Sequence, residues 1–223
     1  MSDSNGQEGS LIELIDHELG ERLERIAAIY EVPLATFANA DDAESRTIAA
    51  PLLAPNPIIQ RIRLEIDDLE GWLVSFYNTA VRETAEEVGA KPERFLWAHA
   101  RGWLRGEVAT ALEAFGSAQG HVHDWAERRA EYSREHTIGR GVLKGFEDAL
   151  SWLGGPKAMA RRASDAIGSL TSADDLEARF QKVSAEFENA AALLHESLYR
   201  TVWAELKHGL VPLLQRISGT DKV

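Results

Sequence analysis

The stretch that decides the fold runs from Pro57 to Val88 and reads PIIQRIRLEIDDLEGWLVSFYNTAVRETAEEV. Its large apolar residues recur at alternating steps of three and four, which places them on one stripe of a helix. A helix over residues 58–88 is about 45 Å long, and such a rod cannot bury its stripe alone. Other segments must therefore pack along it. The stripe comprises Ile59, Ile62, Ile66, Leu69, Leu73, Phe76 and Ala80.

A second long amphipathic segment covers residues 172–210, and no stretch of the chain shows the sustained two-residue alternation of a β-strand. Pro212 lies near the end of this segment and predicts a kink or a stop there. The sequence therefore predicts an all-α protein, an antiparallel helical bundle built on two long amphipathic helices at about 58–88 and 172–210. The apolar stripe of the second helix comprises Leu176, Phe180, Val183, Phe187, Ala190, Leu194, Leu198, Val202 and Leu206.

Proline and glycine divide the rest of the chain into shorter predicted helices. Ser10 caps a helix that ends near Tyr30, because Pro33 disfavours the α conformation just before it. Pro92 opens a helix that ends at the glycines of residues 116–120. We expect residues 1–9 to be a disordered lead, 10–56 an acidic helical segment and connector, and 57–223 the main helical bundle.

Composition narrows the class of protein. The 223 residues carry a formal net charge of −12 and no cysteine, which rules out disulfides, thiol catalysis and cysteine-ligated metal. Nucleic-acid binding is not expected of so acidic a chain. No apolar run is long enough for a transmembrane segment. The polar, acidic start of the chain shows no signal peptide, so we expect a cytoplasmic protein.

Potential metal ligands are densest at His121, His123 and Asp124. The adjacent His123-Asp124 pair resembles that of HD-type phosphohydrolases, which are all-α enzymes. The resemblance implies a divalent metal that activates water, with His99 as the more N-terminal ligand. A metal-dependent phosphohydrolase is therefore one alternative function, and a solvated loop is the other interpretation of these residues.

Acidic residues also cluster at Asp67-Asp68-Leu69-Glu70 on the first long helix. The fifth position of a DDxxD metal motif is occupied here by Gly71, so the spacing does not match that motif. We expect these carboxylates to form a solvated face of the helix.

A further alternative function is binding to an anionic membrane surface through residues 137–170. This segment combines an apolar helix face with glycines and flanking bases. The residues that would contact the membrane are Val142, Leu143, Phe146, Leu150, Trp152 and Leu153.

The first interpretation is a non-enzymatic helical protein that binds a protein partner or a second copy of itself. The chain has long apolar stripes and six tryptophans, but no coherent catalytic constellation or resident cofactor is predicted. Trp103 lies off the apolar stripe of its predicted helix, between Gly102 and Gly106. We therefore expect Trp103 to be a surface anchor for the partner.

Overall fold

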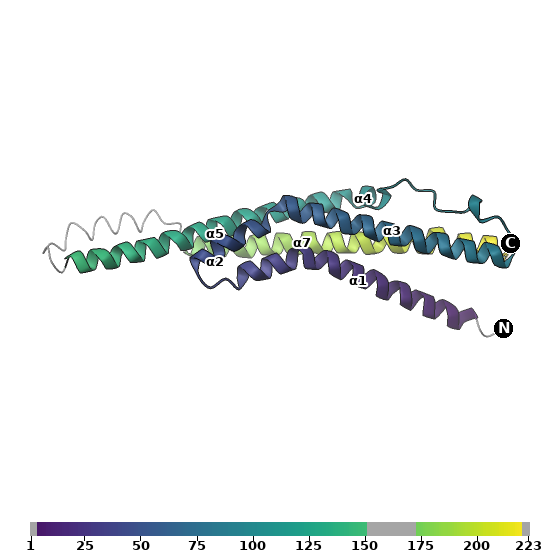
Figure 1. Ribbon diagram of the computed structural model, residues 1–223, viewed down its shortest axis with the longest axis horizontal. Helices are drawn as coiled ribbons and strands as arrows, with labels where there is room; N and C mark the ends of the chain where they lie inside the picture. Colours follow the sequence, from purple (N-terminus) through teal and green to yellow (C-terminus); the bar gives the residue numbers. More distant parts are fainter. Residues whose placement is uncertain (1–3, 151–172, 220–223) are drawn as a thin grey trace. The chain divides into compact units, whose positions relative to one another are not determined.

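The computed structural model describes residues 4–150 and 173–219, with the side chains of residues 15–134 and 178–219 (Figure 1). The described residues form helices and connecting segments without a β-strand, as the periodicity predicts. The described residues contain the two predicted long helices, α3 (Pro55–Glu87) and α7 (Ala173–Ala204), and two more, α1 (Ser4–Ala38) and α5 (Ala109–Leu150). Shorter elements are α2 (Ala43–Ala49), η1 (Ala50–Leu53), η2 (Pro92–Arg94), α4 (Trp103–Glu107), the π-helical turn η3 (Glu205–Leu210) and α8 (Val211–Ile217).

Contacts group the chain into two compact units. Unit 1 comprises Met1–Ile29, Asn56–Phe115 and Ala190–Val223, whereas unit 2 comprises Tyr30–Pro55 and Gly116–Asn189. This grouping differs from a boundary at residues 56–57, because each unit gathers segments that lie far apart in the sequence. Each of the long helices α1, α5 and α7 has one part in unit 1 and its other part in unit 2.

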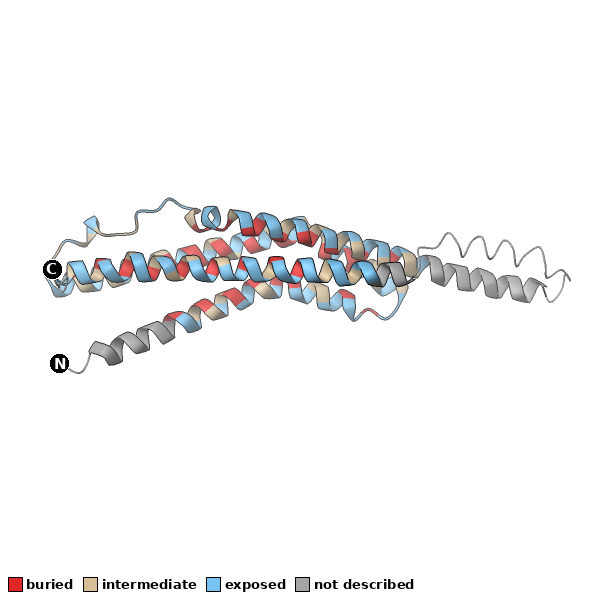
Figure 2. Ribbon diagram, turned by 180° about the vertical axis from the view of Figure 1, so that it is seen from behind, coloured by how far each residue is buried: buried red, intermediate tan, exposed pale blue. Residues whose placement is uncertain are grey.

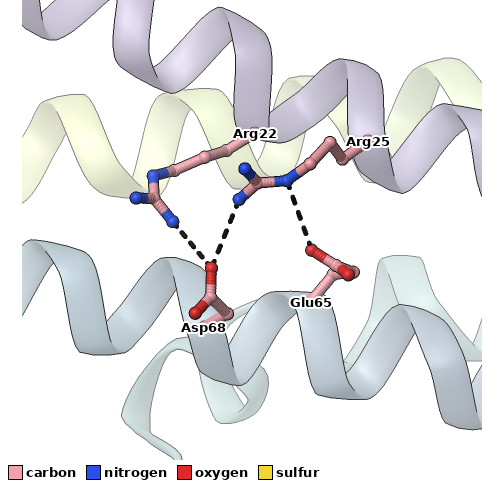
Figure 3. Close-up of polar contacts among 4 residues, drawn as sticks. All are labelled: Arg22, Arg25, Glu65 and Asp68. Atoms are coloured by element: carbon pink, nitrogen blue, oxygen red, sulfur yellow. Dashed lines mark hydrogen bonds and ion pairs between the residues drawn. The ribbon is translucent and has the colours of Figure 1, made fainter.

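Within unit 1, α1 packs antiparallel to α3. The guanidinium of Arg22 donates to the Asp68 carboxylate at 2.7 Å, and Arg25 contacts both Asp68 at 3.3 Å and Glu65 at 3.6 Å (Figure 3). The residue numbers rise along α1 as they fall along α3, which fixes the antiparallel direction. Arg22 also lies over the ring of Trp72 at 5.2 Å from its centroid, a cation–π contact.

The buried stripe of α3 differs in part from the predicted seam. The buried apolar residues follow mainly steps of four rather than an alternation of three and four. Figure 2 shows buried, half-buried and exposed positions interspersed along the described helices. Ile58, Tyr77 and Val81 take the buried positions expected of Ile59, Phe76 and Ala80, which are half-buried. A strict heptad drifts by about 20° per repeat from a straight helix, so the predicted seam leaves the core toward its ends. The buried set is Ile58, Ile62, Ile66, Leu69, Leu73, Tyr77, Val81 and Ala85, together with Glu70.

The helix predicted to end near Tyr30 instead continues through Pro33 to Ala38. Proline removes one helical hydrogen bond and its ring crowds the preceding turn. Aromatic packing in unit 2 holds the helix on both sides of this defect. Tyr30 packs edge-on against Phe187 at 5.5 Å, and Phe37 packs edge-on against Trp125 at 5.5 Å.

The predicted stop at residues 116–120 is also wrong, because α5 runs through both glycines. Its buried stripe continues across them with Phe115, Ala118 and Val122. Each interior glycine costs about 1 kcal/mol relative to alanine, which the burial of large apolar side chains on the same face offsets. Gln119 lies in this stripe, 1% exposed, and its amide donates to the Leu53 carbonyl at 2.7 Å.

The apolar stripe predicted for the last long helix is confirmed where the structure describes it. Residues from Phe187 to Leu206 at steps of three and four are buried, and Phe180 and Val183 are half-buried. Leu176 lies outside the residues whose side chains are described. Pro212 follows the π-helical turn and occupies the first turn of α8, where its missing N–H costs least.

Candidate interaction surface

The segment between α3 and α4 is irregular and carries aromatic side chains, although the sequence predicts a helix there. Gly89 ends α3 with φ +67°, and the Ala90 amide donates to the Ala85 carbonyl at 2.8 Å, the pattern of a Schellman cap. After η2 the chain remains irregular up to Gly102, which has φ +82°. The helix predicted to open at Pro92 is therefore not formed over residues 95–102.

Three aromatic rings of this segment pack against one another. The Trp97 ring meets the His99 ring at 4.9 Å and the Trp103 ring at 5.4 Å, both edge-on. The His99 and Trp103 rings are stacked with their centroids 4.7 Å apart. Tyr77 of α3 packs edge-on against the Trp97 ring, with the ring centroids 5.2 Å apart. We call Trp97, His99 and Trp103 the aromatic cluster.

Two polar side chains of α3 hold the backbone of this segment. The Asn78 amide oxygen accepts from the Trp97 N–H at 2.8 Å. The Glu70 carboxylate accepts from the Gly102 N–H at 2.7 Å and from the Leu104 N–H at 2.8 Å. Glu70 thus caps the start of α4, a role that side chains of the helix itself do not fill. The aromatic cluster is held at both ends by hydrogen bonds to α3.

The C-terminal part of unit 1 adds a carboxylate to the aromatic cluster. Glu205, at the start of η3, places Oε1 at 3.4 Å from Nε2 of His99. Gly209 makes room for this carboxylate, since a Cβ at that position would lie 2.6 Å from Glu205 Oε1. His99 is therefore held between the Trp103 ring and an acidic side chain.

The aromatic cluster is not sealed from solvent. Trp97 and Trp103 are half-buried, and the His99 side chain is 40% exposed. Aromatic side chains that are rigidly held and partly exposed are typical of the anchors of protein interfaces. The cluster therefore presents aromatic contact area to solvent beside the His99–Glu205 pair.

The ionisation of Tyr77 makes the stability of this region depend on pH in the alkaline range. Burial first, and then the negative charge of Glu205, raise the pKa of the Tyr77 hydroxyl, while Arg216 opposes them. The unfolded chain ionises its tyrosines near pH 10, before folded Tyr77 does. The contribution of Tyr77 to folding stability is therefore fully present below about pH 10, and it is lost as the pH rises through the pKa of Tyr77 in the folded state.

We expect Tyr77→Phe to make the free energy of unfolding decline less steeply above pH 10 than it does in the unsubstituted chain. The phenyl ring keeps the contact with Trp97 but has no hydroxyl to ionise. Urea titrations at pH 8, 10 and 11 measure this, with pH 8 as the baseline for each protein. Equal declines in both proteins would contradict the prediction. Some decline remains in either case, because the pKa values of Tyr30 and Tyr199 are also raised.

The predicted anchor residues have distinct places in unit 1. Trp103 is the first residue of α4 and belongs to the aromatic cluster. Gly102 provides the left-handed backbone conformation just before it, which other residues adopt only with strain. Gly106 is exposed, and a Cβ there would meet nothing within 4 Å. Gly102 thus has a conformational role, whereas Gly106 only leaves the surface of α4 uncovered.

The predicted metal ligands are not gathered into one group. His121, His123 and Asp124 lie on α5 in unit 2, where the sequence allowed a solvated loop, whereas His99 belongs to unit 1. Nδ1 of His121 lies 3.0 Å from the Glu186 carboxylate, and Nε2 of His123 lies 3.5 Å from that of Glu127. Among the residues with described side chains, no three His, Asp or Glu side chains are arranged to hold a metal ion.

The predicted membrane-contacting residues fall outside the described side chains. Val142, Leu143, Phe146 and Leu150 lie on α5, where only the helical backbone is described, and Trp152 and Leu153 lie beyond it. None of the described helices has a stretch long and apolar enough to span a bilayer.

Neither Glu70 nor Asn78 is predicted as a site residue, and the prediction that Glu70 lies on a solvated face is wrong, since Glu70 is buried. The helical period could have corrected this, because position 70 is four residues after Ile66 and three before Leu73, both buried. The neighbouring acids have other partners: Asp67 pairs with Arg105 at 2.8 Å, and Asp68 pairs with α1. No comparable signal marks Asn78.

In comparisons with known proteins, no family model, no curated protein and no solved structure matches the chain. The function of the chain must therefore be inferred from the chemistry of its own residues.

Proposed function

We propose that this chain is a non-enzymatic helical protein that associates with a second copy of itself through the aromatic cluster of unit 1. The observation that carries the proposal is the aromatic cluster itself, in which Trp97 and Trp103 are half-buried and His99 is exposed, with its backbone fixed by Glu70 and Asn78. Tryptophans in such positions dominate the binding energy of many protein interfaces. Their geometry is set before binding, so little side-chain entropy is lost on association.

The charges around the aromatic cluster favour a second copy as the partner. A two-fold interface places the same surface on both sides, so it must be self-complementary. Exposed residues of both signs lie in the same short stretch of chain as the cluster: the bases Lys91, Arg94 and Arg101 and the acids Glu93 and Glu107. A two-fold-related copy can therefore set bases of one surface against acids of the other.

Trp103→Ala is expected to weaken self-association about thirtyfold. An interface anchor is worth about 2 kcal/mol or more on truncation to alanine, and 1.4 kcal/mol is about tenfold in Kd. Sedimentation equilibrium over a concentration series measures the Kd, and circular dichroism checks that the helices remain. Trp72→Ala is the matched control, since Trp72 is a half-buried tryptophan of unit 1 that contacts Arg22 instead of the cluster.

Two results would refute the proposal. One is a monomer at every concentration. The other is a dimer whose Kd is the same for the unsubstituted chain, Trp103→Ala and Trp72→Ala. Native mass spectrometry of protein purified without chelator adds an independent count of subunits. The same spectrum reports any bound metal ion, which would favour the hydrolase alternative.

A further inference from the structure

A groove of about 270 Å³ lies between α5 and α7 in unit 2 and is lined mainly by charged residues. Arg128 enters it from α5, and Arg179 and Lys182 enter it from α7. We call it the basic groove. Arg179 and Lys182 are three residues apart and so lie on the same face of α7, which brings the three cations to one place. The other charged lining residues are His121, Asp124 and Glu186.

The cations of the basic groove have no carboxylate partner among the residues with described side chains. Across the residues with described side chains, Arg128, Arg179 and Lys182 form no ion pair within 4.0 Å. Glu186 lies 3.0 Å from His121, and Asp124 is the other lining carboxylate. Three cations against two carboxylates leave a balance of one positive charge, with His121 counted as neutral.

Three arginines of unit 1 are paired instead. Arg22, Arg25 and Arg105 each lie within 3.6 Å of a carboxylate of α3. An uncompensated group of cations repels itself within the Debye length, which is about 8 to 10 Å at physiological salt. A bound anion reduces this repulsion.

The remaining lining of the basic groove is apolar. Val183 and Trp125 are half-buried there. Phe180 and Phe37 fix the Trp125 ring, with centroids 4.6 Å and 5.5 Å away. The groove therefore combines a rigid aromatic wall with cations, which suits a ligand that has both an anionic group and an apolar body.

We propose that the basic groove binds a phosphate monoester. Such a group carries a charge of about −1.5 to −2 at neutral pH, and the three cations of the groove outnumber its two carboxylates. The forked guanidinium groups of Arg128 and Arg179 can each donate two hydrogen bonds to phosphate oxygens, and Lys182 adds a point charge. Trp125 and Val183 contact the apolar body that carries the phosphate. The source is either a soluble phosphate monoester or the headgroup of a lipid such as phosphatidic acid.

The soluble arm of the test uses phenyl phosphate and inorganic phosphate, followed by phosphorus NMR with the full chain. We expect saturable binding that weakens with salt, and phenyl phosphate should bind more tightly than inorganic phosphate because of Trp125. The double variant Arg179→Ala/Lys182→Ala should weaken binding about tenfold or more. Arg61→Ala/Arg82→Ala is the matched control, since it removes two exposed arginines of α3 in unit 1 and should leave the affinity unchanged.

The lipid arm uses co-sedimentation with phosphatidylcholine vesicles that contain phosphatidic acid or, as a control, phosphatidylglycerol. Phosphatidic acid has a monoester headgroup, whereas phosphatidylglycerol has a diester with a single charge. Binding that prefers phosphatidic acid and is lost in the groove variant supports the proposal with a lipid source. Binding of phenyl phosphate without vesicle binding supports it with a soluble source.

The proposal is overturned if neither phosphate compound binds through the millimolar range and vesicles are not bound either. Equal binding by the groove variant and the control variant would also overturn it. All four substituted side chains are exposed, so both variants should keep the fold, and their circular dichroism should be unchanged.

Discussion

Replacing Glu70 with alanine is expected to lower the free energy of unfolding of unit 1 by about 3 kcal/mol. Glu70 is 6% exposed and accepts two backbone hydrogen bonds, from Gly102 and Leu104. Hydrogen bonds to a charged group are worth about 1.5 to 3 kcal/mol each, and the Leu104 N–H is buried, so no water replaces the lost partner there. Alanine thus removes the cap of α4 and one of the two attachments of the aromatic cluster.

Tryptophan fluorescence during urea unfolding measures this loss, because Trp72, Trp97, Trp103 and Trp203 all belong to unit 1. Glu70→Gln should show a smaller loss, since its amide oxygen can still accept one of the two hydrogen bonds. Glu83→Ala is the control, as an exposed glutamate on the same helix, and should change stability by less than about 0.5 kcal/mol. A loss in Glu70→Ala no larger than in Glu83→Ala would show that the cap does not hold this segment.

The same substitution tests the proposed function. If the aromatic cluster forms the self-association surface, freeing its backbone should weaken association even where the helices remain folded. The expected result is a Kd that rises in Glu70→Ala and stays unchanged in Glu83→Ala. An unchanged Kd in both variants would mean that the cap formed by Glu70 does not contribute to self-association.

Periodicity predicted the long helices well because burial on one face repeats with the helical turn. The all-α class and the apolar stripe of α7 follow from this repeat alone. The predicted ends were wrong at Pro33 and at Gly116 to Gly120, where α1 and α5 continue. Local backbone preferences of about 1 to 3 kcal/mol set those predictions, and the packing of neighbouring aromatic and apolar side chains outweighs them.

The candidate site could be predicted only in part. The mismatch between Trp103 and its apolar stripe indicated a residue that is not in the core, and Trp103 is indeed half-buried. Its neighbours Trp97 and His99 could not be placed, because residues 95–102 were assigned to a helix. The hydrogen bonds that shape this segment come from Glu70 and Asn78, which lie far away in the sequence, and no local pattern encodes them.

The second large expected effect is the loss of about 3 kcal/mol on replacing Leu23 with alanine, which tests whether α1 is an integral part of unit 1. Leu23 is 2% exposed, and its neighbours Arg22 and Arg25 pair with Asp68 and Glu65 of α3. The ion pairs are largely exposed and contribute little, so the buried leucine carries most of the attachment.

Leu64→Ala is the matched control, because Leu64 is a leucine of α3 that is 68% exposed. It should change stability by less than about 0.5 kcal/mol. If α1 were an appendage outside the cooperative unit, Leu23→Ala would leave the urea midpoint of the unit 1 tryptophans unchanged. A loss of the expected size, with an unchanged slope against urea, would instead mean that α1 unfolds together with α3 and α7. The acidic N-terminal segment would then belong to the core that positions the aromatic cluster.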